Sequence, residues 1–262
     1  MIKKHFKKLV SLALAAVMVM GMSATAFAAE SDANTYTTDT GITVDQSIQQ
    51  SVVDNLPEST KLELQNDDGT LVFASTTYYD LETGSTSRAV MPTSDFKLTV
   101  TATRLSSSQM AADGVYGDAF KFVATGEWLV NPLYEFTDCI GISWSDDFTL
   151  YDDYGYTYTK DYNGLPFFNF DALTRNDVSA EEGVAHDVYL LLFDRQDEVT
   201  LVAKVYKANS SGSANVCASY GHVIITASSV DVSFSKGKEI SMSVGFASGI
   251  KKASPAYESF DY

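Results

Sequence analysis

Histidine, cysteine and basic side chains are scarce in this chain, and each shortage argues against a class of function. The 262 residues include 3 histidines, 2 cysteines and 18 lysines and arginines, against 34 aspartates and glutamates. With so few ligands, a zinc centre built from cysteine and histidine is not expected. The excess of negative charge disfavours nucleic acid and anionic membrane surfaces as partners, because like charges repel over roughly a Debye length.

Long hydrophobic runs are rare as well, and the marked one lies at the N-terminus. Four lysines between residues 3 and 8 precede an apolar run over 9–22, and Ala-Phe-Ala at 26–28 is the pattern that signal peptidase reads. We expect a signal peptide over 1–28 and an exported protein without a transmembrane anchor. Removing 28 of 262 residues leaves 234, and removing four of 18 basic side chains leaves 14 against 34 acidic ones.

The two cysteines, Cys139 and Cys217, both lie in the expected mature chain. In an exported protein an even number of cysteines is first interpreted as a disulfide framework. A bridge closing so long a loop would stabilise the fold by roughly 4 kcal/mol on the chain-entropy model. We therefore predict a Cys139–Cys217 disulfide, with two buried free thiols as the alternative.

Residues 29–92 form a polar N-terminal segment with its own predicted elements. Asp45 is placed to cap a short helix and Pro57 to end it. The predicted elements are a helix over 45–56 and a hairpin of strands over 61–65 and 70–74. A polar, turn-rich stretch around Arg88 marks a boundary, so the segment is either part of the same fold or a pro-region cleaved near Arg88.

From residue 93 to 262 the dominant hydrophobic period is two. Phe96, Leu98 and Val100 alternate with Thr99 and Thr101, which predicts a half-buried strand with a threonine-rich outer face. About ten such short strands are separated by turn signals, with almost no helix. The pattern predicts an all-β fold, a two-sheet antiparallel β-sandwich of jelly-roll or immunoglobulin-like type, with one short N-terminal helix.

Catalytic groups are few. Ser143 lies in Gly-Ile-Ser-Trp-Ser, which lacks the second glycine of a nucleophile elbow and falls within a predicted strand. His186 and His222 are the two histidines after the signal, and neither has a recognisable nucleophile beside it in sequence. We predict no catalytic residue and favour a protein that is not an enzyme.

Acidic side chains gather in successive turns of one predicted hairpin, at Asp146, Asp147, Asp152 and Asp153. Calcium takes six to eight oxygen ligands without strict geometry, so clustered carboxylates in turns are candidate ligands. The spacing matches no EF-hand. A solvated acidic turn without a metal is the alternative.

Aromatic side chains suggest a binding surface. Trp128 and the closely spaced Tyr154, Tyr156 and Tyr158 are the candidate ligand-binding residues, because aromatic rings flanked by polar groups stack on sugar faces. Ordinary packing between strands would give the same pattern.

Together these features predict an exported, acidic, non-enzymatic β-sandwich that binds carbohydrate or another cell-envelope polymer, with calcium as a candidate cofactor. The alternatives are a matrix or self-assembling protein that uses threonine-rich faces and exposed sheet edges, a secreted hydrolase, or a membrane-active toxin.

Overall fold

A computed structural model describes the chain from residue 34 onward, with gaps. The described residues are 34–81, 85–87, 95–130, 132, 136–145, 148–160, 166–167, 172–189, 198–207, 212–224, 230–236, 238, 240–243 and 250–261. The predicted signal peptide lies outside them, and so remains a prediction. In the described part of the chain, no helix has both the length and the hydrophobicity needed to cross a bilayer.

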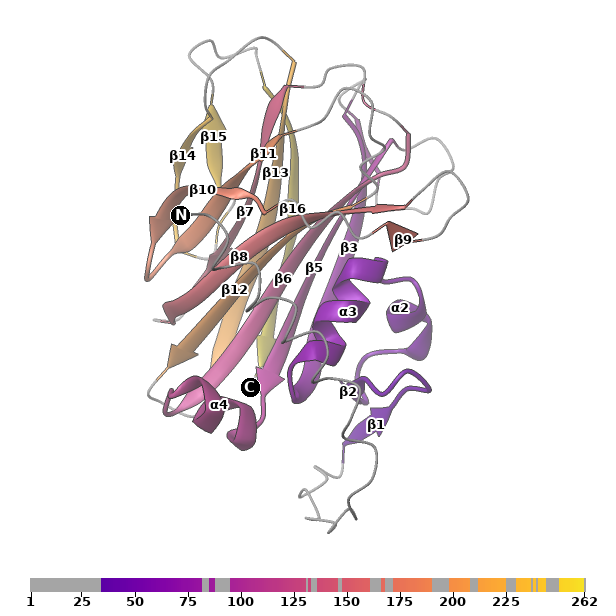
Figure 1. Ribbon diagram of the computed structural model, residues 1–262, viewed down its shortest axis with the longest axis vertical. Helices are drawn as coiled ribbons and strands as arrows, with labels where there is room; N and C mark the ends of the chain where they lie inside the picture. The colour runs from indigo at the N-terminus through magenta and orange to yellow at the C-terminus, as the bar shows by residue number, and fades with distance from the viewer. Residues whose placement is uncertain are drawn as a thin grey trace, which may run out of the picture. The chain divides into compact units, whose positions relative to one another are not determined.

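Two sheets dominate the structure (Figure 1). Sheet A has nine strands: β1 Thr35–Thr37, β2 Thr43–Asp45, β3 Gly69–Asp80, β4 Ser85–Ser87, β5 Phe96–Leu105, β6 Asp118–Trp128, β12 Glu198–Lys207, β8 Thr149–Lys160 and β9 Pro166–Phe167. Sheet B has five: β10 Thr174–Ser179, β11 Gly183–Tyr189, β7 Thr137–Trp144, β13 Ser213–Val223 and β16 Ile250–Asp261. Apart from the short parallel pair β2–β3, neighbouring strands run antiparallel, which confirms the predicted β-sandwich.

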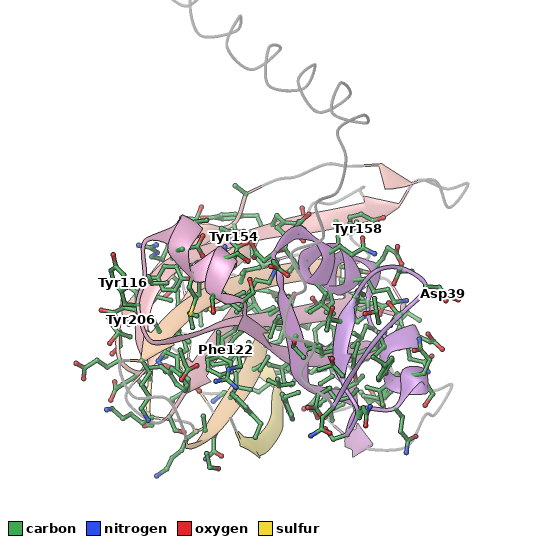
Figure 2. The ribbon with its side chains drawn as sticks, turned by 90° about the horizontal axis from the view of Figure 1, so that it is seen from below. Asp39, Tyr116, Phe122, Tyr154, Tyr158 and Tyr206 are labelled. Carbon is green, nitrogen blue, oxygen red and sulfur yellow. The ribbon has the colours of Figure 1, made fainter. Side chains whose placement is uncertain are left out.

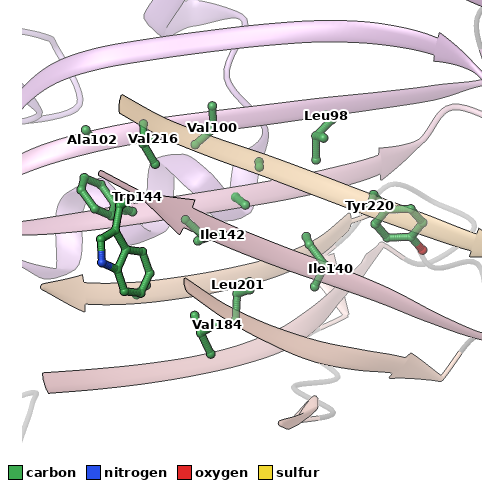
Figure 3. Packing of buried hydrophobic residues seen from close by; sticks show 14 of the residues in the cluster. Leu98, Val100, Ala102, Ile140, Ile142, Trp144, Val184, Leu201, Val216 and Tyr220 are labelled. Atoms are coloured by element: carbon green, nitrogen blue, oxygen red, sulfur yellow. The ribbon is translucent and has the colours of Figure 1, made fainter. Parts of the chain in front are cut away.

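The core lies between the two sheets because each long strand turns alternate side chains inward. Leu98 and Val100 of β5 and Leu201 of β12 meet Ile140 and Ile142 of β7 across this space, all of them fully buried (Figure 3). Phenylalanine, tyrosine and tryptophan rings fill the rest, in stacked and edge-to-face pairs.

A third layer, formed by the helical segment 50–66, lies against the outer face of sheet A. It holds the helices α2 Gln50–Asp54 and α3 Glu58–Asn66 and packs its own small apolar cluster of Val53, Leu56 and Leu64 against β2 and β3. The predicted helix over 45–56 was therefore too long. Asp45 ends β2 and its carboxylate accepts the Ser47 N–H in a local turn.

The hairpin predicted over 61–65 and 70–74 was wrong in its first half, which is α3. Lysine, leucine, glutamate and glutamine all favour a helix, and this preference outweighed the alternating pattern of the five residues. Thr99 and Thr101 do lie on the outer face of β5, opposite its core residues, but both are fully buried, so the prediction of a half-buried strand was wrong. Since β3 pairs with β5 inside sheet A, much of the segment 29–92 belongs to the same fold.

A smaller hairpin, β14 Asp231–Ser233 with β15 Ser241–Ser243, covers the outer face of sheet B. Val230, Ile240 and Met242 bury this face together with Cys139 and Ala185 of sheet B. A further helix within the described residues, α4 Ser107–Asp113, joins β5 to β6 at the lower end of the view in Figure 1. Ser106 caps α4 by accepting the Gln109 N–H, and Gly114 ends it in a left-handed conformation.

The edges of both sheets carry features that oppose pairing with another chain. In sheet A the described path ends at strands of three and two residues, β1 and β9. In sheet B, β10 has a register shift, and β16 has a register shift together with Lys251, Lys252 and Pro255, which has no N–H to donate. Short, bulged, lysine- and proline-bearing edges discourage edge-to-edge assembly.

Candidate functional site

The tyrosines predicted to bind a ligand lie on the outer face of sheet A, beneath α3. The hydroxyls of Tyr154 and Tyr156 donate to the two carboxylate oxygens of Glu63, at 2.6 and 2.8 Å. Tyr156 and Tyr158 are buried, and Tyr154 is half-buried. Burial in this interface raises the pKa of both Tyr154 and Tyr156, with Glu63 adding to the effect. Tyr154 and Tyr156 are bound to the protein's own helix through Glu63, and Tyr156 and Tyr158 are buried, so the three rings do not form an exposed face for a sugar.

Trp128 is buried in the core on the other face of the same sheet. Its indole N–H donates to the Tyr220 hydroxyl at 3.3 Å, and that hydroxyl donates to Asp138 at 2.7 Å. The Asp138 carboxylate also lies 3.0 Å from Nδ1 of His222 and accepts the Val223 N–H at 2.8 Å. Trp128 and Tyr156 therefore do not share a surface, and the site predicted from Trp128, Tyr154, Tyr156 and Tyr158 is not formed.

Of the four predicted calcium ligands, the structure describes Asp152 and Asp153, and it does not bring these two together. Asp146 and Asp147 lie outside the described residues. On β8, Asp152 pairs with Lys204 and Asp153 with Ala203, which places the two carboxylates on opposite faces of sheet A. Within the described residues, no group of histidine, cysteine, aspartate and glutamate side chains could hold a metal ion.

The predicted disulfide is not formed either, because Cys139 and Cys217 are buried free thiols. Both point to the outer face of sheet B, but Cys217 pairs with Ser143, four residues along β7 from Cys139. Four residues of strand span about 13 Å, beyond the roughly 7 Å that a disulfide can bridge between Cα atoms. Burial raises the pKa of the Cys139 thiol, so this thiol is a poor nucleophile.

The serine-hydrolase alternative has no geometry to support it. Ser143 faces the outer side of sheet B, where its hydroxyl donates to the Lys238 carbonyl oxygen. His186 and His222 both point to the inner side, toward Asp153 and Asp138 respectively. A nucleophile and a base on opposite faces of one sheet cannot exchange a proton.

The structure brings together a different set of aromatic side chains, at the end of sheet A next to α4. Tyr151 of β8 and Tyr206 of β12 are half-buried and meet edge to face, with ring centroids 6.1 Å apart. Tyr116 is 88% exposed and precedes β6, whose first residue, Asp118, pairs with Lys207 directly after Tyr206. In the view of Figure 2 the labelled Tyr116 and Tyr206 fall at the same rim of the molecule. We call Tyr116, Tyr151 and Tyr206 the tyrosine platform.

Carboxylates flank the tyrosine platform and hold one of its rings. The Tyr151 hydroxyl donates to Asp113 at 2.9 Å, and burial, with Asp113 as a further cause, raises the pKa of this tyrosine. Asp113 also accepts the side-chain amide of Gln109 at 2.9 Å and lies 3.6 Å from the Lys204 ammonium. Asp152 is exposed on the same face as Lys204. The platform therefore combines apolar ring surface with acceptors for hydroxyl groups.

None of Tyr116, Tyr151 and Tyr206 was named as a candidate ligand-binding residue in the sequence analysis. Tyr116 stands between Gly114 and Gly117, both with positive φ, which marks a tight loop that can display a ring at the surface. Tyr206 is the one aromatic residue of β12 and stands next to Lys207 at the end of the strand. Only the register of β6, β12 and β8 brings the three together.

Comparison with known proteins gives no assignment. No family model and no curated protein sequence matches the chain. Among solved structures, it is similar to the KRT10-binding region domain of the pneumococcal serine-rich repeat protein PsrP, with 10% identity, a TM-score of 0.33, and coverage of 56% of this chain and 84% of that one. The C-terminal domain of the AgI/II polypeptide BspA of Streptococcus agalactiae gives 11% identity and a TM-score of 0.34, over 73% of this chain and 49% of that one.

A third solved structure, described as a pore-forming protein, gives 7% identity and a TM-score of 0.31, over 72% of this chain and 89% of that one. The chain spans about half the length of the BspA domain. At such low identities and TM-scores, these similarities carry no argument about ligand or activity. The candidate binding site is therefore defined by the geometry of the described residues alone.

Proposed function

We propose that this protein is an exported binding module that holds carbohydrate or another cell-envelope polymer on its tyrosine platform. The observation that carries the proposal is the grouping of an exposed ring, Tyr116, with the half-buried pair Tyr151 and Tyr206 beside the carboxylates of Asp113 and Asp152. Aromatic rings cover the apolar faces of pyranose sugars, and carboxylates accept hydrogen bonds from their hydroxyls.

Two further features support export and binding as opposed to catalysis. The N-terminal pattern of lysines, apolar run and Ala-Phe-Ala is that of a signal peptide. Both histidines of the described chain are buried, one beside Asp138 and the other beside Asp153 and Arg175. A surface platform suits an extended polymer, because successive sugar units can contact neighbouring rings without entering a closed pocket.

The experiment is a glycan array and a cell-wall pulldown with the mature chain, followed by titration of any ligand found. A Tyr116→Ala, Tyr206→Ala double variant should weaken binding by about tenfold or more, which corresponds to about 1.4 kcal/mol. Tyr189→Ala is the matched control, because Tyr189 is 53% exposed but ends β11 in sheet B, away from the platform. Binding that survives the double variant, or no binding to any glycan or wall preparation, would contradict the proposal.

A further inference from the structure

Three charged or titratable side chains link the two sheets on the side of the sandwich where β8, β10 and β11 meet. Asp153 of β8 turns its carboxylate into the space between the sheets, where Nε2 of His186 on β11 lies 2.8 Å from one oxygen. Arg175 of β10 binds both oxygens, with Nε at 3.0 Å from one of them and Nη2 on the other. The side chains of His186 and Asp153 are 5% and 3% exposed, whereas that of Arg175 is 52% exposed.

The surroundings of His186 favour its neutral form. Its Nδ1 is buried and has no hydrogen-bond partner among the described residues, so the hydrogen bond at Nε2 assigns the proton to Nε2. A second proton would lie on a buried nitrogen without an acceptor in the described chain. It would also add a positive charge beside Arg175.

The charged groups facing His186 are Asp153 from β8, Arg175 from β10 and Asp187 on its own strand, while its neighbour on β7 is the apolar Ile140. Burial lowers the pKa of His186 below its ordinary value. Asp153 opposes that effect, and Arg175 adds to it.

The cluster is a side-chain link between β10 and sheet A, in addition to main-chain hydrogen bonds that join β8 to Leu173 and Ala180, the residues flanking β10. It is a six-residue edge strand with mostly exposed or half-exposed side chains, and it pairs with β11 through a register shift. Asn176 ties it to the Val230 carbonyl of the segment before β14, and Arg175 ties it across the sandwich to Asp153. An edge strand with few buried side chains is among the first elements to open locally.

We propose that Asp153, His186 and Arg175 form a pH-sensitive latch that holds β10 against the sandwich at neutral pH and releases it on acidification. A released β10 leaves His186 in contact with water, where its pKa returns toward the ordinary 6.5. Below pH 6.5 the open state takes up a proton that the closed state resists, so acid favours opening. Opening of β10 then increases by up to about tenfold for each pH unit below 6.5, until the pKa of the closed state is reached.

The test is hydrogen exchange of the backbone amides of residues 174–179 at pH 7.5 and 5.5, corrected for the intrinsic exchange rates. We expect protection of these amides to fall by up to about tenfold between the two pH values, while amides of β13 in the centre of sheet B keep theirs. Equal losses of protection in β10 and β13 would show that acid destabilises the whole fold, and would overturn the proposal.

The variant His186→Gln separates the latch from other acid effects, because glutamine can still donate an N–H to Asp153 but does not titrate. Its β10 protection should be nearly independent of pH over this range. A loss as large as that of the native chain would overturn the proposal. An NMR titration of His186 in the native chain gives a second measurement that requires no variant, and a pKa at or above 6.5 would also overturn it.

Discussion

Replacement of Lys121 by methionine tests how the third layer is held on sheet A. Lys121 of β6 has a side chain with 0% exposure, and its ammonium group lies 2.8 Å from the Asp67 carboxylate at the end of α3. The same group donates to the main-chain carbonyl of Glu63 in the last turn of that helix. A cation at this end of a helix also interacts favourably with the helix dipole.

The expected cost follows from what Lys121→Met leaves behind. Removing one partner of a buried ion pair typically destabilises a protein by about 3–5 kcal/mol, because the other charge stays buried. Asp67 keeps a second partner, Lys204, at 3.2 Å, and methionine refills most of the space of the lysine stem. We therefore expect a loss at the lower end, about 3 kcal/mol. It would be measured as a fall in the urea midpoint with an unchanged slope, monitored by tryptophan fluorescence.

Arg104→Gln is the matched control. Arg104 pairs with Asp118 at 2.7 Å, but its side chain is 40% exposed, and such pairs contribute at most about 1 kcal/mol. Adding Asp67→Asn to Lys121→Met should recover part of the loss, because no uncompensated carboxylate remains. If Lys121→Met costs no more than Arg104→Gln, or if the two changes at the pair simply add, the ion pair is not what holds α3.

Two further outcomes are expected. A thiol reagent should leave Cys139 and Cys217 unmodified in the native protein and should react with two thiols after unfolding without reductant. If no thiol reacts after unfolding, the two cysteines form a disulfide. Glu198→Gln should lower the free energy of unfolding, measured in urea, by about 1–2 kcal/mol, because the Glu198 carboxylate accepts hydrogen bonds from the N–H groups of Glu58 and Ser59 at the start of α3. A loss below about 0.5 kcal/mol would mean that this contact is dispensable.

The sandwich could be predicted from sequence because the long strands repeat with period two over many residues. Phe96, Leu98 and Val100 point into the core as the alternation requires, and Ile140 and Ile142 do the same from the facing sheet. The order and register of strand pairing could not be predicted in this way. An alternation with period two shows which face of the sheet a residue occupies, but it does not show which strand lies beside it.

The predicted sites failed for a related reason. From sequence, a tyrosine on the outer face of a strand is predicted to be exposed, and this prediction is wrong when another layer covers that face. Tyr156 is covered by α3, whose own sequence alternates briefly like a strand. For Cys139 and Cys217, both the shared face and the adjacent strands favour contact, and only the four-residue offset in register separates them.

Trp128 illustrates the opposite case. Its polar sequence neighbours suggested a surface ring, but the inner face of β6 continues through it into the core. The Asp138 carboxylate that completes its hydrogen-bonded surroundings lies ten residues away on the other sheet. Hydrogen bonds between buried polar groups on different sheets can be recognised from the folded structure, and not from the local sequence pattern.

The way α3 is attached has a consequence for the order in which the chain folds. Its N-terminal turn is bound by Glu198, about 140 residues later in the chain, and its last turn by Lys121. Helix α3 is synthesised early but has no docking surface until β6 and β12 have paired, and a helix of nine residues is marginal on its own. Such long-range closure slows folding, because loop entropy is lost before the contacts form. If the predicted signal peptide directs export of the unfolded chain, late docking of α3 would delay the final compact state until most of the sequence has emerged.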